Sequence, residues 1–194
     1  GAHLPDANKR MDCSDLLANL PKLKVVTTGK NGVDYFSQSD LQEIKYHQLD
    51  ILVRCGFGIL KGDVLNVAKY GIWSFHHGDN LTNRGGPAGF WESMESWPET
   101  GAMLQILTED LDNGKVLVRS YSCTNSMSAQ DNNSNNAWKA LSFMTRKMEE
   151  LYLVGEEVFF KRVNEENRHP VFYSDRLYTK PTNFELAILT FRKL

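Results

Sequence analysis

A histidine and an aspartate stand where two segments with strand character come to an end. His76 closes the apolar run 71–76, and Asp112 follows shortly after a second run over 102–107. An imidazole has a pKa near neutrality, so it suits proton transfer or, as an imidazolium, charge stabilisation. A carboxylate beside it can orient the ring and help to relay the proton. The pair therefore predicts acid–base or electrostatic chemistry at one edge of a sheet.

Each of these residues also has a purely structural interpretation. A lone histidine after a strand is usually a polar loop residue. Asp112 directly precedes Asn113-Gly114, so turn formation alone would explain its presence. The adjacent His77 is interpreted as a loop residue. Cys55 is expected to be buried on its strand rather than to act as a nucleophile. The elements around His76 and Asp112 must decide between the two interpretations.

Those elements alternate between strand and helix along the chain. The expected strands cover 23–28, 49–55, 72–76, 102–107 and 115–122. The expected helices cover 12–20, 40–47 (with Ser39 as its cap), 62–70, 85–96 and 137–154. Alternation at this spacing argues for a parallel sheet, in which ligand chemistry gathers at the carboxyl ends of the strands. Asn113-Gly114 predicts a hairpin turn between the last two strands.

The chain is expected to divide into a core over 1–122 and an extension over 123–194 that packs on it. The Ser/Asn-rich stretch 122–136 predicts a loop, residues 155–183 are expected to be irregular, and 184–194 to form a short helix or strand. The helix over 137–154 is expected to turn five apolar residues inward: Trp138, Leu141, Met144, Met148 and Leu151.

The composition of the 194 residues excludes several classes of function. A net charge of −2, with 41% hydrophobic and 24% charged residues, is ordinary for a globular protein and gives no basic surface for nucleic acid. Three cysteines without Cys-x-x-Cys spacing argue against a metal site and a disulfide framework, and they favour a cytoplasmic setting. No membrane anchor is expected, because no apolar run approaches the roughly 20 residues needed to span a bilayer. Because residue 1 is glycine, a further N-terminal domain or segment of a parent chain is expected.

Five motifs follow one another at fixed spacing around the two candidate residues. They are Ser74-Phe75-His76, Arg84-Gly85, Trp91, Thr100-Gly101 and Leu111-Asp112-Asn113-Gly114. In this order they resemble the catalytic core of the folate-dependent formyltransferases over 52–117. That family includes methionyl-tRNA, glycinamide ribonucleotide and sugar N-formyltransferases. The resemblance implies an α/β fold with a Rossmann-like, mostly parallel sheet flanked by helices.

Two departures from the family pattern bear on activity. The family's catalytic asparagine, which the resemblance implies would polarise the formyl carbonyl and stabilise the oxyanion, is Ser74 here. Asn80 and Asn83 in the following loop are candidates to replace it. The family's first strand–helix–strand unit has no counterpart in the chain.

The resemblance implies transfer of a formyl group from 10-formyltetrahydrofolate to a primary amine, with His76, Asp112 and Ser74 as catalytic residues. The residues implied in donor binding are Gly56, Phe57, Gly58, Ile59, Leu60, Glu109 and Leu111. Those implied in a substrate loop are Asn80, Asn83 and Arg84. Trp91 is expected in the core. The glycines permit close approach of backbone to a flat ring, although turn formation alone also explains them.

Three functions stay open at this point. A small amine acceptor, such as a nucleotide-linked amino sugar, is favoured over tRNA because residues 137–194 carry near-balanced charge and are too few for a further basic barrel. A related enzyme would hydrolyse the formylfolate with water as acceptor. The third alternative, which Ser74 and the missing unit favour, is a non-catalytic binding or regulatory domain of a larger protein.

Overall fold

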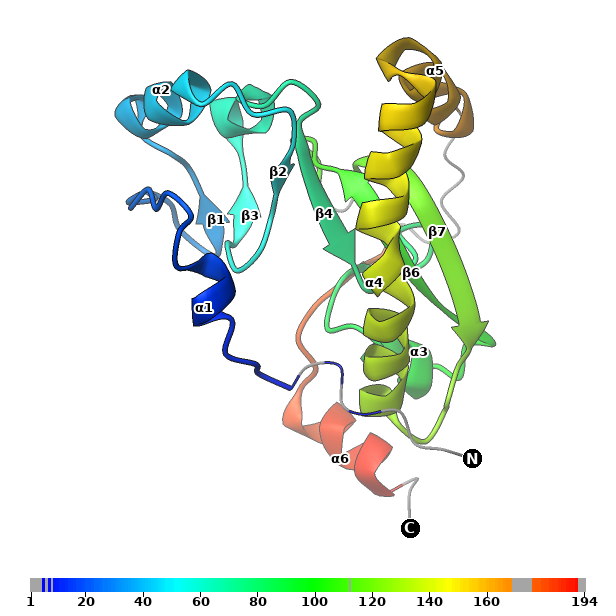
Figure 1. The fold of residues 1–194 in the computed structure, drawn as a ribbon. Coiled ribbons are helices and arrows are strands. Elements are labelled where there is room, and N and C mark those ends of the chain that lie inside the picture. The colour runs from blue at the N-terminus through cyan, green and yellow to red at the C-terminus, as the bar shows by residue number, and fades with distance from the viewer. Residues whose placement is uncertain (1–4, 6, 8, 112, 169–175, 192–194) are drawn as a thin grey trace.

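A mixed four-stranded sheet lies at the centre of the fold, in a computed structural model that describes residues 5, 7, 9–111, 113–168 and 176–191. Its strand order is β2-β4-β6-β7. These strands are β2 (Leu52–Val53), β4 (Ile72–His76), β6 (Glu99–Ile106) and β7 (Lys115–Cys123). Figure 1 shows the long helix α4 (Ala129–Val154) crossing one face of the sheet beside β6 and β7. The α/β fold class is therefore confirmed.

The direction of the strands differs from the expected one. β2 and β4 are parallel, whereas β4 with β6 and β6 with β7 are antiparallel, so the expectation of a mostly parallel sheet is wrong for this sheet. A hairpin connection from Ile106 to Lys115, which includes Asn113-Gly114 but is longer than a two-residue turn, makes β7 run antiparallel to β6. The one helix in the connection from β4 to β6, which the structure describes throughout, is α3 (Phe90–Met94). Five helical residues span about 8 Å, too short to run back along a strand of about 16 Å.

Two short parallel pairs flank this sheet. They are β1 (Val33–Asp34) with β3 (Ile59–Leu60), and β5 (Arg84–Gly85) with β8 (Leu177–Tyr178). Residues 23–28, all of them described, contribute only an isolated bridge between Thr28 and Tyr35, so the strand expected there is absent. Within the described chain β2 pairs with β4 alone, which leaves Val53 45% exposed. Cys55 is likewise exposed, and its expected burial is wrong.

The N-terminal helices are shorter or shifted relative to the expected ones. α1 spans Ser14–Leu17, and residues 62–70 give only a 3₁₀ helix over Gly62–Asn66. α2 spans Gln38–Tyr46, and its cap is Ser37 rather than Ser39: Ser37 Oγ accepts a hydrogen bond of 3.2 Å from the backbone N–H of Asp40. None of the helices in the described part of the chain is long and apolar enough to cross a bilayer.

Helix α4 begins within the segment that the sequence predicts to be a loop. Ser128 Oγ caps it by accepting from the N–H of Asp131, at 3.2 Å. Asn132 and Asn136 are buried, and Asn136 Nδ2 donates to the carbonyl of Gly101 on β6 at 2.7 Å. This tertiary bond compensates for the low helix propensity of asparagine.

The buried asparagines also set which face of α4 meets the sheet. Ala140, Phe143 and Leu151 continue their face into the core. Trp138, Leu141 and Met148 are 36%, 62% and 44% exposed, so their predicted inward orientation is wrong. The apolar pattern alone misplaces the face because polar side chains form the interface at the start of the helix.

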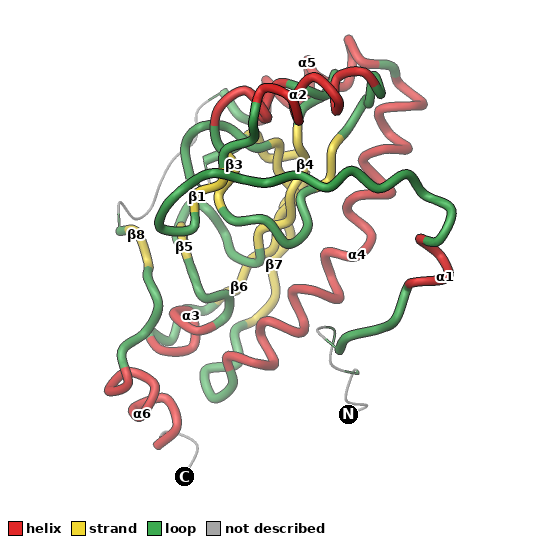
Figure 2. The backbone as a smooth tube through the Cα atoms, turned by 90° about the vertical axis from the view of Figure 1, so that its left-hand side faces the viewer, coloured by secondary structure: helices red, strands yellow, loops and turns green. Residues whose placement is uncertain are grey.

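The last two helices lie in segments that the sequence leaves open or irregular. α5 (Glu156–Glu166) occupies part of the segment expected to be irregular, and it follows Gly155, whose φ of +76° separates it from α4. α6 (Asn183–Phe191) confirms the helical alternative near the C-terminus. Figure 2 shows α6 beside α3, where Leu189 joins a cluster with Phe90, Trp91 and Tyr178. Trp91 is buried, as expected.

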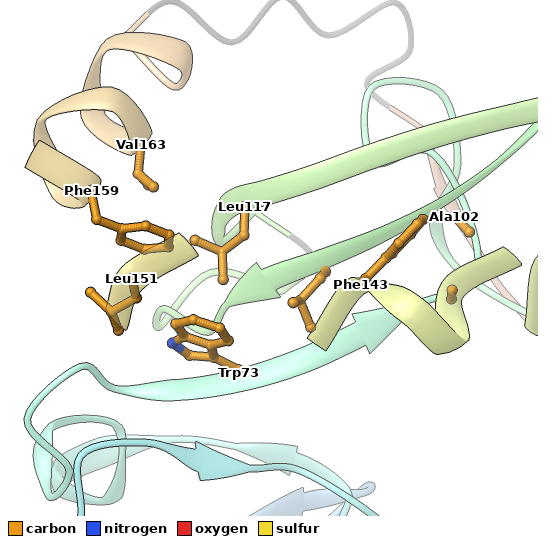
Figure 3. Packing of buried hydrophobic residues seen from close by; sticks show 9 residues of the cluster. Trp73, Ala102, Leu117, Phe143, Leu151, Phe159 and Val163 are labelled. Atoms are coloured by element: carbon orange, nitrogen blue, oxygen red, sulfur yellow. The ribbon is translucent and has the colours of Figure 1, made fainter. Parts of the chain in front are cut away.

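Trp73 stands at the centre of the main core, between the sheet and the two long helices (Figure 3). Its side chain has no exposed surface, and its ring stacks on Phe159 of α5 with centroids 6.1 Å apart and planes 7° from parallel. Leu117, Phe143 and Leu151 complete its surroundings. Because successive residues of a strand point to opposite faces, anchoring Trp73 in this core directs Ser74 to the other side of β4.

Candidate functional site

A cavity of about 80 Å³ lies alongside the C-terminal half of β4. Ser74 and His76 both line it, so two of the three predicted catalytic residues come together. Three predicted donor-binding residues line it as well: Ile59, Leu60 and Leu111. The third predicted catalytic residue, Asp112, lies outside the described residues.

The ring of His76 is held by the loop that follows it. Nε2 of His76 lies 3.0 Å from the backbone oxygen of Asn83. A carbonyl only accepts hydrogen bonds, so Nε2 carries a hydrogen and donates it. In the neutral ring the lone pair therefore belongs to Nδ1. The contact fixes both the tautomer and the orientation of the candidate catalytic imidazole.

The hydroxyl of Ser74 is buried, with only 2% of the residue exposed. Its Oγ donates to the carbonyl of Phe75 at 3.3 Å and accepts from Nη1 of Arg54 at 3.5 Å. Both contacts are long, so they hold the hydroxyl weakly. Its single hydrogen can turn toward an oxygen in the cavity only by leaving Phe75.

Arg54, which sequence reasoning did not single out, braces the loop beside the cavity. Its Nε donates to the carbonyl of Gly58 at 2.9 Å, and its Nη2 donates to that of Phe57 at 2.7 Å. The signal available in the sequence is a single cation within the otherwise apolar run 51–55. The fork of guanidinium donors fixes two successive carbonyls, which a lysine cannot do.

Gly58 is required by close packing of backbone against backbone. A Cβ at this position would lie 2.2 Å from the carbonyl oxygen of Gly32, and the N–H of Gly58 donates to Asp34 Oδ2 at 2.6 Å. Gly56 has a different role, because its φ of +83° belongs to the left-handed region and nothing crowds its Cβ position.

Replacing Gly58 with alanine is therefore expected to lower the free energy of unfolding by about 1–3 kcal/mol, since the backbone must shift to admit the methyl group. Urea unfolding measures the change. Gly86→Ala is the matched control, because the nearest atom to its added Cβ is 3.9 Å away and its φ is not positive. An equal effect of the two substitutions would contradict the packing argument.

A second, larger cavity of about 650 Å³ adjoins the first and shares Arg54 and Leu60 with it. Its walls are mainly apolar and include Phe57, Val64 and Ile72. The ring of Phe57 packs against Phe36 at a centroid distance of 5.4 Å. The remaining donor-binding candidate, Glu109, accepts from the N–H of Gly62 at 2.9 Å, at the start of the 3₁₀ helix.

An ion pair and a hydrogen bond to β7 hold the predicted substrate loop in place. Asp79 pairs with Arg119 of β7 at 3.1 Å, and Arg119 Nη2 donates to Asn80 Oδ1 at 2.6 Å. Arg84 begins the short strand β5. Asn80 and Asn83 are buried, and among the described residues neither lines the cavity of Ser74. The suggestion that either amide replaces the family asparagine is therefore not supported.

Two titratable groups, the half-buried His77 and the buried Glu92, lie close to His76. Burial, and secondly the charge of His76, lower the pKa of His77. Burial raises the pKa of the Glu92 carboxyl, against several smaller effects that include its hydrogen bond from Asn83. Glu92 Oε1 accepts from Asn83 Nδ2 at 3.0 Å. Sequence reasoning missed Glu92, although an acid within the bulky run 90–94 is the signal that marks it.

No protein-family model matches the chain, but two curated proteins do. The methionyl-tRNA formyltransferase of Prochlorococcus marinus is 36% identical over 88 residues, which are 44% of this chain and 26% of that protein. That of Synechococcus sp. is 37% identical over 98 residues, 50% of this chain and 28% of that protein. This chain is a formyltransferase relative. The resemblance given by the five motifs is thereby confirmed.

The formyltransferase likeness extends to the fold. A sugar N-formyltransferase from Shewanella sp. FDAARGOS_354 superposes with a TM-score of 0.50 at 15% identity, covering 81% of this chain and 65% of that one. The comparison shows a shared fold. This formyltransferase relative spans only about a quarter of the length of the two curated proteins that it matches.

Proposed function

We propose that this formyltransferase relative transfers a formyl group from 10-formyltetrahydrofolate to a primary amine of a small acceptor. The observation that supports the proposal most directly is the cavity beside β4, which gathers Ser74, His76, Leu60 and Leu111 in a chain related to formyltransferases. The donor supplies a formyl carbon on a nitrogen that can leave once it is protonated. The protein must remove one proton from the acceptor amine, stabilise the oxyanion and return a proton to the leaving nitrogen.

In this proposal His76 carries out the proton transfer. The carbonyl of Asn83 keeps Nε2 protonated, so Nδ1 of the neutral ring takes the proton of the acceptor amine. We assign Asp112 the role of stabilising, by its charge, the imidazolium that forms. The imidazolium then stabilises negative charge in the cavity and returns the proton to the leaving nitrogen. Ser74 Oγ donates one hydrogen bond to the oxyanion.

The donor is proposed to extend across both cavities. The smaller one, at about 80 Å³, has room for the reacting atoms, whereas ligand sites for molecules of folate size measure about 300–1,000 Å³. The larger cavity, at about 650 Å³, falls in that range and has the apolar walls that suit a flat ring. Gly56, Phe57, Gly58 and Glu109 then lie around the ring system or the chain that joins it to the formyl nitrogen.

A small acceptor is supported by charge. The chain has a net charge of −2, with 22 basic and 24 acidic residues, so it lacks the excess of cations that binding to a nucleic-acid backbone requires. We therefore propose an amine such as an amino sugar linked to a nucleotide, which the loop of Asn80, Asn83 and Arg84 would help to position.

Restoring the family asparagine with Ser74→Asn is expected to raise kcat by up to about 10²-fold, because one oxyanion-hole donor contributes about 10²–10³ in rate. Release of tetrahydrofolate in the presence of a panel of amines measures the change. Ser74→Ala is the matched control, and it should lower kcat instead. An asparagine variant slower than wild type would contradict the assigned role of position 74.

A non-catalytic ligand-binding domain is the second candidate, and Ser74 is the observation that favours it. Under this alternative 5-formyltetrahydrofolate, a stable analogue of the donor, binds, but neither wild type nor Ser74→Asn transfers or hydrolyses a formyl group. Turnover of the donor without any amine would instead indicate a formyltetrahydrofolate hydrolase. One assay with and without amine therefore separates the three functions.

A further inference from the structure

Glu92 of α3 is a buried acid two contacts away from the candidate catalytic imidazole. Only 1% of Glu92 and 1% of Asn83 is exposed. Glu92 Oε1 accepts from Asn83 Nδ2 at 3.0 Å, and the backbone oxygen of the same Asn83 holds His76 Nε2 at 3.0 Å. The side chain of Asn83 thus faces the acid while its main chain faces the histidine. Any movement of Asn83 would be transmitted to the ring of His76.

Two oxygen atoms of these side chains lack a hydrogen bond. Among the described residues, Glu92 Oε2 and Asn83 Oδ1 are both buried without a hydrogen-bond partner. Both are acceptors when Glu92 is ionised, and a buried acceptor that receives no hydrogen bond loses the solvation it has in water without compensation. One added hydrogen on Oε2, donated to Asn83 Oδ1, would satisfy both atoms, while Oε1 continues to accept from Asn83 Nδ2.

The surroundings favour the neutral acid. Burial is the largest influence on Glu92 and raises the pKa of its carboxyl. The smaller, opposing influences on this pKa come from the Asn83 amide, from the nearby backbone of Glu92 and Gly89, and from the charge of His76. Burying a carboxylate costs far more than burying the protonated acid unless a cation pairs with it.

We propose that Glu92 is a positioning residue that works as a neutral acid: it holds the side chain of Asn83 by two hydrogen bonds and so keeps the Asn83 carbonyl on His76 Nε2. This chain of hydrogen bonds from Glu92 through Asn83 to His76, here called the clamp, fixes the tautomer in which Nδ1 of the neutral imidazole carries the lone pair. Only its catalytic consequence rests on the proposed function; the clamp itself is a property of the fold.

Isosteric substitution tests the proposal. Glutamine places a carbonyl oxygen and an N–H group where the neutral acid has Oε1 and Oε2–H, so Glu92→Gln preserves both bonds, whereas Glu92→Leu removes both. Nitrogen-15 NMR of the His76 ring reports the tautomer. We expect wild type and Glu92→Gln to show Nε2–H alone, and Glu92→Leu to show a mixture of tautomers.

Two further variants keep the test decisive. Asn83→Ala retains the backbone carbonyl but removes the partner of Glu92, so it should give the same mixture even if Glu92→Leu folds poorly. Glu95→Gln is the matched control, because Glu95 near the end of α3 binds Arg176 and Tyr178 instead, and it should leave the His76 signals unchanged. Loss of the Nε2–H tautomer in Glu92→Gln, or its retention in both Glu92→Leu and Asn83→Ala, would overturn the proposal.

A kinetic comparison adds the functional consequence. Glu92→Leu should have a kcat up to about 10²-fold below that of Glu92→Gln with the KM for the donor unchanged, because a misplaced catalytic group slows chemistry without weakening binding. A parallel rise in KM would indicate general distortion and overturn the positioning role. If no variant, including wild type, transfers formyl groups, the proposed function fails while the NMR result still decides the clamp.

Discussion

Replacing His76 with alanine is expected to lower kcat for formyl transfer by about 10²–10⁴-fold, the range for loss of a positioned acid–base group. The ring lines the cavity beside β4, and its Nε2 is fixed by the carbonyl of Asn83, so no solvent group takes over its geometry. Affinity for the donor should change by less than about tenfold, because the apolar walls that hold its ring system lie in the neighbouring cavity.

Measuring kcat and donor affinity together separates catalysis from folding. His77→Ala is the matched control: it changes the neighbouring imidazole, which is half-buried like that of His76 but does not line the cavity among the described residues. This control should retain most of the turnover. Equal losses in the two variants, or loss of donor affinity in His76→Ala alone, would contradict the role given to His76.

The largest effect on stability is expected for Trp73→Ala, at about 3–5 kcal/mol of unfolding free energy. Trp73 has no exposed surface, stacks on Phe159 of α5 and contacts residues of α4 and β7 in the same core. Removing the indole leaves a cavity at the point where the sheet and both long helices meet. It also loosens β4, the strand that carries Ser74 and His76.

Trp138→Ala provides the comparison, since the same chemical change is made on the outer face of α4. Trp138 is 36% exposed, and its Nε1 donates to the carbonyl of Pro5 at 2.6 Å. Its loss should cost at most about 1.5 kcal/mol, the value of one hydrogen bond. Guanidinium unfolding followed by circular dichroism measures both variants. A Trp138 effect as large as that of Trp73 would contradict the assigned core.

Strand β4 illustrates what sequence alone predicts well in this fold. The apolar run between Gly71 and the polar loop after His76 gives both ends of the strand correctly. The Asn113-Gly114 signal likewise gives the β6–β7 hairpin correctly. In both cases the information is local: turn residues bound an apolar segment, so neighbouring residues alone determine the element.

The start of α4 and the residues around the site show where sequence prediction stops. Asn132 and Asn136 are helical because of bonds to residues more than thirty positions away. Arg54 and Glu92 gain their roles from loops that fold back on them, which no periodicity records. By contrast, Ser74 and His76 could be predicted together because they share one strand and one face.

Binding of 5-formyltetrahydrofolate, a stable analogue of the donor, tests the central claim most directly. Calorimetry should be carried out on this chain and on its His76→Ala variant, with circular dichroism to establish that each is folded. The account predicts one-to-one binding to both, since the donor is held by the two cavities rather than by the imidazole. Absence of binding to the folded wild-type chain would contradict the proposal that residues around β4 form a formyl-donor site.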